Sequence, residues 1–180
     1  HGVLRYFDEL WKRAGLMPFN PNQLAIGTLS TDLASVTGIF PAVTKFDGDL
    51  GYQFTATLTS LDDAFPVLQT VTGSVLVEGN AVLTSAVAAF PALETVGGAV
   101  HFTGNTLLAN MTGTMDALTA IGYELHVQDL DLGLNPFPEF LSLQEIGKDP
   151  DAPGGNSTLR IQANLGAWTL NTCFPLLTDV

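Results

Sequence analysis

The chain has 180 residues, 46% of them apolar, and 18 carboxylates against six Lys and Arg give a formal net charge of −12. This length suffices for one well-buried core, and the negative charge repels nucleic acids and anionic lipids, which argues against DNA or RNA as a partner. No stretch approaches the ~18 consecutive apolar residues of a membrane-spanning helix, so we expect no membrane span in this segment.

Residues 1–17 carry apolar side chains at helical spacing, and Gly15 and Pro18 end the pattern. We interpret 1–17 as an N-terminal helix that caps the end of a repeat domain; a separate membrane or partner helix is the alternative. Residues 18–39 are punctuated by prolines and glycines and form an irregular segment or a degenerate first coil.

From residue 40 onward the chain repeats itself every 25 residues. The residues that open each repeat are large and apolar: Phe40, Phe65, Phe90, Met115 and Phe140. A fixed period of this size predicts a solenoid, in which similar coils bury their apolar faces against each other. The fifth repeat contains an insertion at 148–156, and the solenoid is expected to fill 40–180 and to continue beyond 180.

Each repeat predicts one short strand, a turn and a return path, because apolar residues alternate with polar or small ones at period two. Glycines at 48, 73 and 98 are expected to turn the chain at positive φ. Asn80, Asn105 and Asn164 recur at one point, where they are expected to hydrogen-bond the backbone of the next coil. The predicted fold is mainly β: a right-handed parallel β-helix or leucine-rich-repeat-like solenoid with ~25-residue coils and an N-terminal capping helix.

The repeats FPVLQTVTGSVLVEGNAVL, from Phe65, and FPALETVGGAVHFTGNTLL, from Phe90, carry a family resemblance. Their pattern resembles that of receptor L-domains, the leucine-rich-repeat-like domains of insulin and epidermal growth factor receptors. It is also similar to repeats of fungal cell-wall glycoproteins and protist surface proteins. The resemblance implies a cell-surface or cell-wall protein whose scaffold is reused for many partners. Receptor L-domains are usually closed by disulfides, whereas this chain has one cysteine, which favours the wall or surface glycoprotein branch.

The outward residues of the strands are the candidates for ligand binding, because the open sheet face is the usual recognition surface of a solenoid. The expected central ladder runs through Gly51, Leu76, His101, His126 and Arg160. Polar residues flank it on both sides. The candidate ligand-face residues are Leu76, Glu78, His101, Thr103, Glu124, His126, Gln128, Arg160 and Gln162.

His101 and His126 occupy equivalent positions of adjacent repeats, so their side chains are expected to lie ~5 Å apart. One interpretation is a pH-sensitive or metal-binding pair, and the other is two solvated histidines on a polar face. Glu78 and Glu124 are near, but the sequence indicates no third ligand. We therefore assign no metal site and no cofactor from the sequence.

Two segments are acidic: one contains Asp129 and Asp131, and the other contains Asp149 and Asp151. Both lack the EF-hand pattern, so we interpret them as solvated loops rather than calcium sites. N-glycosylation acceptors occur at Asn110 and Asn156. Cys173 either pairs with a cysteine outside this segment or is a free buried thiol. The chain starts without Met and ends inside a repeat, as expected for a piece of a longer secreted precursor.

No catalytic motif is present: the sequence has no G-x-S-x-G, no H-E-x-x-H and no phosphate-binding glycine loop. We therefore expect a non-catalytic extracellular protein, a structural or assembly component of a cell-surface or matrix structure. Its partners are expected to be other protein subunits or surface glycans, in a homo- or hetero-assembly. A receptor or adhesin that binds a protein or carbohydrate on its strand face is the alternative, and a polysaccharide-active β-helix enzyme is a distant third.

Overall fold

The computed structural model describes residues 24–25, 34–38, 40–131, 140–147, 158–162 and 174–178. In these residues the chain forms a parallel β-solenoid of 25-residue coils, as the repeat predicts, with no helix among them. The expected capping helix at 1–17 lies outside the described residues, as do Asn156 and Asn164.

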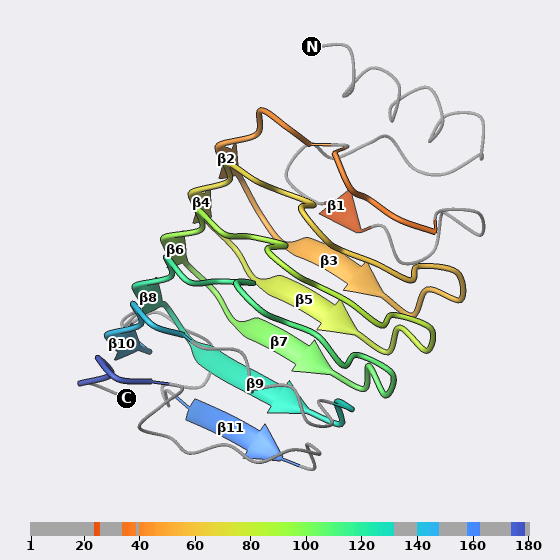
Figure 1. Ribbon diagram of the computed structural model, residues 1–180. Coiled ribbons are helices and arrows are strands. Elements are labelled where there is room, and N and C mark those ends of the chain that lie inside the picture. The colour runs from red at the N-terminus through yellow and green to blue at the C-terminus, as the bar shows by residue number, and fades with distance from the viewer. Residues whose placement is uncertain are drawn as a thin grey trace.

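One side of the solenoid is a six-stranded parallel sheet in which every strand pairs with the equivalent strand of the adjacent coil (Figure 1). Its strands, in spatial order, are β1 (Leu24–Ala25), β3 (Leu50–Gln53), β5 (Val75–Glu78), β7 (Val100–Thr103), β9 (Glu124–Gln128) and β11 (Thr158–Gln162). Because β1 pairs with β3, residues 24–25 belong to a coil that precedes the first clear repeat.

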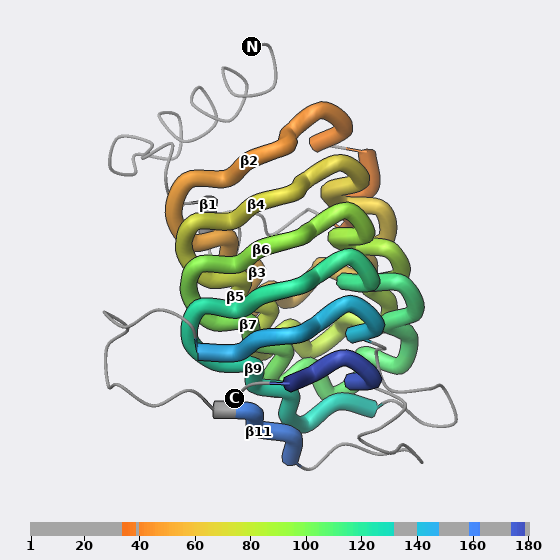
Figure 2. The backbone as a smooth tube through the Cα atoms, turned by 90° about the vertical axis from the view of Figure 1, so that its left-hand side faces the viewer, coloured from red at the N-terminus to blue at the C-terminus, as the bar shows by residue number. Residues whose placement is uncertain are grey.

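A second parallel sheet lies on another side of each coil (Figure 2). It consists of two-residue strands: β2 (Lys45–Phe46), β4 (Thr70–Val71), β6 (Thr95–Val96), β8 (Ala120–Ile121) and β10 (Glu145–Ile146). Isolated parallel bridges, from Ser35 through Ser60 and Ser85 to Asn110, form a third row. The expectation of one strand per coil was therefore incomplete, because two-residue strands are too short to show an alternating pattern in the sequence.

The core is a continuous column of apolar side chains between the sheets. All five residues that open the repeats are buried, and the rings of Phe40 and Phe65 stack with centroids 4.6 Å apart. Phe65 stacks in turn on Phe90 at 5.6 Å, and Phe140 stacks on Phe174 at 5.3 Å. Phe174 therefore takes the same place one coil further along the chain.

The nine-residue insertion at 148–156 leaves the register intact. Thr158 of β11 pairs with Glu124 of β9, which lies 34 positions earlier, nine more than the 25-residue period. Leu159 and Ile161 pair with Leu125 and Val127 and pack against the core. The nine extra residues therefore do not shift the pairing of β11 with β9.

Asn80 and Asn105 form a buried ladder that ties neighbouring coils together, as expected from their recurrence. Asn105 Nδ2 donates to the carbonyl oxygen of Val77 at 2.8 Å, and Asn105 Oδ1 accepts from the backbone N–H of Asn80 at 2.9 Å. Asn80 makes the same kind of bonds with Tyr52 and Thr55. Each amide therefore binds the preceding coil and satisfies backbone groups that are shielded from water.

The glycine positions require a correction. Of Gly48, Gly73 and Gly98, only Gly48 has a positive φ, at 108°. At Gly73 a Cβ atom would lie 2.6 Å from the carbonyl carbon of Gly48, and at Gly98 it would lie 3.0 Å from that of Gly73. Glycine is therefore required at these two positions because the backbones of successive coils approach closely, and not because of the turn itself.

The strand register predicts opposite effects for two neighbouring substitutions in β5. Val77 is fully buried, whereas Leu76 lies half-buried on the outward face. Val77→Asp places an unpaired charge in the core, and we expect it to lower the free energy of unfolding by more than about 4 kcal/mol in urea denaturation followed by circular dichroism. Leu76→Asp is the matched control, with a loss of about 1 kcal/mol or less. Equal losses would contradict the register.

The asparagine ladder predicts a second stability effect. Asn105→Leu fits the volume, since Leu130 occupies the equivalent position of the next coil, but it leaves polar groups of Asn80 and Val77 buried without partners. We expect a loss of about 2–4 kcal/mol in the free energy of unfolding in urea, because each unsatisfied group costs about 1–3 kcal/mol. Thr106→Ala, at the exposed neighbouring position, is the control. A neutral Asn105→Leu would show that the ladder contributes nothing to stability.

Candidate functional site

The outward face of the six-stranded sheet contains the candidate ligand residues in three parallel ladders. The central ladder pairs Gly51, Leu76, His101, His126 and Arg160 in succession. One flanking ladder pairs Gln53, Glu78, Thr103, Gln128 and Gln162, and Glu124 pairs with Thr158 on the other flank. The structure thus brings all nine candidate residues onto one face, in the register that the sequence predicts.

The side chains on this face are mostly half-buried rather than freely solvated. Leu76, Glu78, Thr103 and Gln128 are half-buried, whereas Arg160 and Gln162 are exposed near the last strand. The side chain of His101 is 20% exposed, and that of Glu124 is 15% exposed. These side chains cover one another, and their polar atoms are correspondingly paired within the face.

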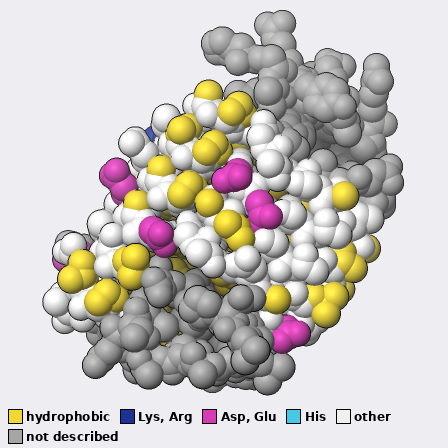
Figure 3. All heavy atoms as spheres, in the orientation of Figure 1, with side chains coloured by type: hydrophobic (Ala, Val, Ile, Leu, Met, Phe, Trp, Pro, Cys, Tyr) yellow, Lys and Arg dark blue, Asp and Glu magenta, His cyan; other side chains and the backbone are white. Residues whose placement is uncertain are grey.

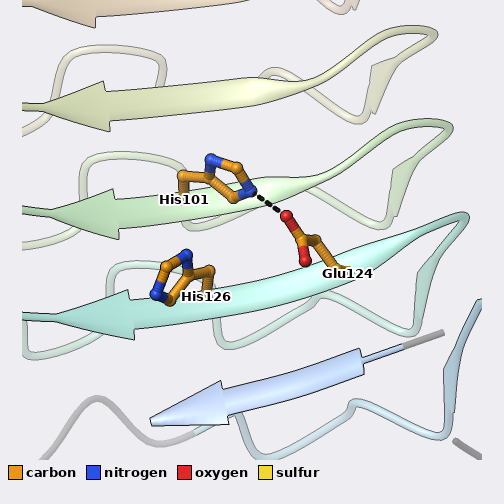
Figure 4. A group of neighbouring side chains, drawn as sticks. All are labelled: His101, Glu124 and His126. Carbon is orange, nitrogen blue, oxygen red and sulfur yellow. Dashed lines mark hydrogen bonds and ion pairs between the residues drawn. The ribbon is translucent and has the colours of Figure 1, made fainter. Parts of the chain in front are cut away.

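A chain of hydrogen bonds that includes His101 crosses four strands. His101 Nδ1 lies 2.9 Å from Glu78 Oε1, and His101 Nε2 lies 2.6 Å from Glu124 Oε1 (Figure 4). Glu78 is held in turn by Gln53, whose Nε2 donates to Glu78 Oε2 at 2.6 Å. Strands β3, β5, β7 and β9 each contribute one side chain to this chain, so its geometry depends on the coil register.

The two carboxylates determine what His101 does chemically. A neutral imidazole carries one N–H, so it can donate to only one of them, whereas the imidazolium donates to both. In either form the ring is held between the two glutamates, which fixes its orientation on the face.

His126 lies beside His101, with ring centroids 5.5 Å apart and an angle of 82° between the rings. Its Nε2 lies 3.0 Å from Gln128 Oε1, and Gln128 Nε2 donates to Asp129 Oδ2 at 2.9 Å. The bond to Asp129 fixes the orientation of the Gln128 amide, so that its oxygen faces the imidazole. His126 therefore donates from Nε2, and its Nδ1 carries the lone pair.

His101, Glu124 and His126 form a potential metal-binding group. One ligand atom from each of them lies within 4.8 Å of the other two, and Figure 4 shows His101 and Glu124 facing each other with the His126 ring beside His101. Two imidazoles and one carboxylate are a donor set that suits zinc and related divalent ions.

From the sequence we predicted the histidine pair and expected both glutamates to lie near it. The hydrogen bonds from His101 to Glu78 and Glu124 were not predicted. Glu78, His101 and Glu124 occupy three different positions of the repeat, so equivalent positions alone do not bring them together. They meet along a diagonal, since Glu78 is opposite Thr103 and Glu124 is opposite Ala99, each two residues away from His101. The signal in the sequence is a residue of opposite charge that lies two positions before or after the equivalent position of the adjacent coil.

The remaining polar candidates stand apart from the cluster. Asn110 lies in the third row of bridges, half-buried, where its Oδ1 accepts hydrogen bonds from the backbone N–H and the hydroxyl of Thr112. Its use as a glycosylation site stays a prediction. Asp129 accepts from Gln128 and Asp131 is half-buried, whereas Asp149 and Asp151 lie outside the described residues.

Beneath the face, burial raises the pKa of the Tyr52 phenol well above its ordinary value. Its hydroxyl is buried without a hydrogen-bond partner among the described residues, and its ring contacts Phe65 edge to face. Tyr52 therefore stays neutral and acts as a core residue under the polar ladders.

Comparison of the chain with protein-family models, with curated proteins and with solved structures finds no match.

Within the part of the chain that the structure describes, no helix has the length and apolar character needed to cross a membrane. On the side of the solenoid shown in Figure 3, apolar and acidic side chains are scattered among uncharged ones instead of gathering into one large patch.

The His101–Glu124 bond predicts a measurable energetic coupling. In a double-mutant cycle of His101→Ala and Glu124→Ala, we expect a coupling energy of about 0.5–3 kcal/mol in the free energy of unfolding, because both side chains are largely shielded from water. The control cycle is Thr70→Ala with Thr95→Ala, whose hydroxyl oxygens lie 3.4 Å apart on the second sheet and should couple by less than about 0.5 kcal/mol. Equal couplings in the two cycles would contradict the charge-assisted bond.

Proposed function

We propose that this chain is a non-catalytic, extracellular repeat module of a cell-surface or matrix assembly, and that it holds its partner on the outward face of the six-stranded sheet. The observation that carries the proposal is the polar face itself: three ladders of side chains in register over successive coils. A solenoid uses such an extended face for recognition because each coil adds one more set of contacts.

Preorganisation supports this choice of face. Gln53, Glu78, His101 and Glu124 already hold each other in one arrangement. A partner that docks on them does not have to order free side chains, which is one of the main costs of association. The exposed Arg160 and Gln162 adjoin this ordered part and add free donors.

The chemistry of the face favours a neutral or cationic polar partner. Amide, hydroxyl, imidazole and carboxylate groups alternate on it, and among the described residues of the face only Arg160 is a permanent cation. Such a mixture suits the hydroxyl groups of a carbohydrate or a polar protein surface, whereas an anionic partner meets the repulsion of a chain with a net charge of −12.

The resemblance of the repeats to receptor L-domains and to wall or surface glycoproteins supports the extracellular location. The two glycosylation acceptors, at Asn110 and Asn156, agree with it. One cysteine in 180 residues separates the chain from the disulfide-closed receptor domains, so a wall or surface glycoprotein is the branch that we propose.

A purely structural role is the second candidate, in which the chain joins an assembly through its lateral faces or its ends. It is supported by the way the column extends past β11: Phe174 stacks on Phe140, and Thr178 N–H donates to Gln144 O at 3.0 Å. Coils of this kind stack without interruption into longer rods, which suits a building element.

One experiment separates the two roles. A triple variant, His101→Ala with His126→Ala and Arg160→Ala, removes the outward ladder, and a control variant, Lys45→Ala with Thr70→Ala and Thr95→Ala, alters the second sheet. We expect the ladder variant to bind intact surfaces or matrix of the source cells at least about tenfold more weakly than the wild type, while the control binds normally. Binding is measured with the fluorescently labelled chain, and thermal unfolding checks the fold of both variants.

The opposite pattern of binding by the two variants would contradict the recognition role. If the ladder variant binds like the wild type and the control variant loses binding, the lateral face joins the assembly and the structural role is correct. Light scattering of the full-length protein, with and without deglycosylation, then gives the size of that assembly.

A further inference from the structure

We propose that His101, Glu124 and His126 bind a divalent transition-metal ion of the zinc type on the outward face of the six-stranded sheet. The site is a property of the isolated chain, so it goes beyond the proposed recognition role and does not depend on it. The proposal rests on the proximity of three suitable donor side chains, whose ligand atoms all lie within 4.8 Å of one another.

The distances require only a small adjustment of the side chains. Zinc lies about 2.0–2.1 Å from imidazole nitrogen and about 2.0–2.2 Å from carboxylate oxygen, so its ligand atoms are roughly 3–3.5 Å apart in a tetrahedral site. His101 Nε2 and Glu124 Oε1 now lie 2.6 Å apart across a hydrogen bond and have to separate slightly to admit the ion. The ion takes the place of the proton between them, and His126 closes in from the adjacent position on β9.

Glu78 prepares His101 for this role. Its Oε1 accepts the Nδ1 proton of His101 at 2.9 Å, which leaves Nε2 to act as the ligand atom. A carboxylate that accepts the other N–H of a ligating histidine fixes the orientation of the ring and raises its basicity. Glu78 is itself held by Gln53, so this support extends over two more strands.

Gln128 orients His126 in the same way as Glu78 orients His101. Its amide oxygen accepts from His126 Nε2 at 3.0 Å, so that Nδ1 of the same ring is the nitrogen with a lone pair. Both histidines thus have one nitrogen engaged by an outer partner, which leaves the other nitrogen of each ring for the metal ion. Two supported histidines beside a carboxylate distinguish this cluster from a group of solvated polar residues.

The donor set selects the kind of ion. Calcium and magnesium prefer six or more oxygen ligands, whereas two imidazole nitrogens and one carboxylate oxygen favour zinc and its first-row neighbours. The nearby charge of Glu78 adds attraction for a dication. Three protein ligands leave a tetrahedral position open for water or for a donor atom of a bound partner.

Zinc titration of the untagged chain by isothermal calorimetry tests the site directly. The background carries His1→Ala and Cys173→Ser, which remove the third histidine and the single thiol of the sequence. We expect one zinc ion per chain in this background. Glu78→Gln should raise the zinc Kd by roughly 10–100-fold. Loss of a ligand, in His126→Ala or Glu124→Gln, should raise it further.

Thr103→Ala is the matched control, because Thr103 lies on the same face in β7 and is not part of the cluster; its zinc Kd should equal that of the background. Cobalt substitution supplies a second readout, since a site with two nitrogen ligands gives visible absorption bands that disappear in His126→Ala. Unchanged zinc affinity in His101→Ala with His126→Ala, or no zinc binding by the folded background chain, would overturn the proposal. Both results are obtained without a partner, so they stand independently of the recognition experiment.

Discussion

The structure depends on one constraint: each coil must place the same kind of residue directly over its counterpart 25 positions earlier. In the interior this constraint makes aromatic rings stack on aromatic rings, as Phe40, Phe65 and Phe90 do. It also allows asparagines at the same point of two successive coils to satisfy the backbone of the preceding coil, because Asn105 binds Asn80 and Val77 in the way that Asn80 binds Thr55 and Tyr52. The apolar stack supplies the driving force for stacking, and the buried amides, which tolerate no slippage, fix the register.

The same constraint on the outside builds the candidate site. Parallel strands hold outward residues of adjacent coils about 4.8 Å apart, which is within reach of side-chain hydrogen bonds. Polar residues at equivalent or diagonal positions can therefore reach one another, and the imidazole of His101 meets two carboxylates in this way. Charges so close together are stable only when they are paired, so the alternation of Glu78, His101 and Glu124 is what permits three ionisable side chains to be half-buried on one face.

Much of the architecture could be predicted from the sequence, because a 25-residue period, an alternating strand and a recurring asparagine each have one simple structural meaning. The residues of strands β3, β5, β7 and β9, their outward and inward directions and their pairing partners follow from that period, whereas β1 lies in a segment whose register the sequence left open. The second sheet could not be predicted, since strands such as Thr70–Val71 are too short to alternate. The role of Gly73 was missed for another reason: the approach of the Gly48 backbone is a contact between coils, and no local pattern reports it.

Comparison of equivalent positions in successive coils predicts only part of the site. Equivalent positions predicted that His101 and His126 lie together, and their ring centroids are 5.5 Å apart. The two glutamates come from other columns, and only their diagonal approach turns a pair of histidines into a hydrogen-bonded network. In a solenoid the diagonal neighbours are as constrained as the direct ones, because both are set by the same register. A repeat protein can therefore build a specific polar site from residues of different columns, while every coil beneath it keeps the common apolar pattern.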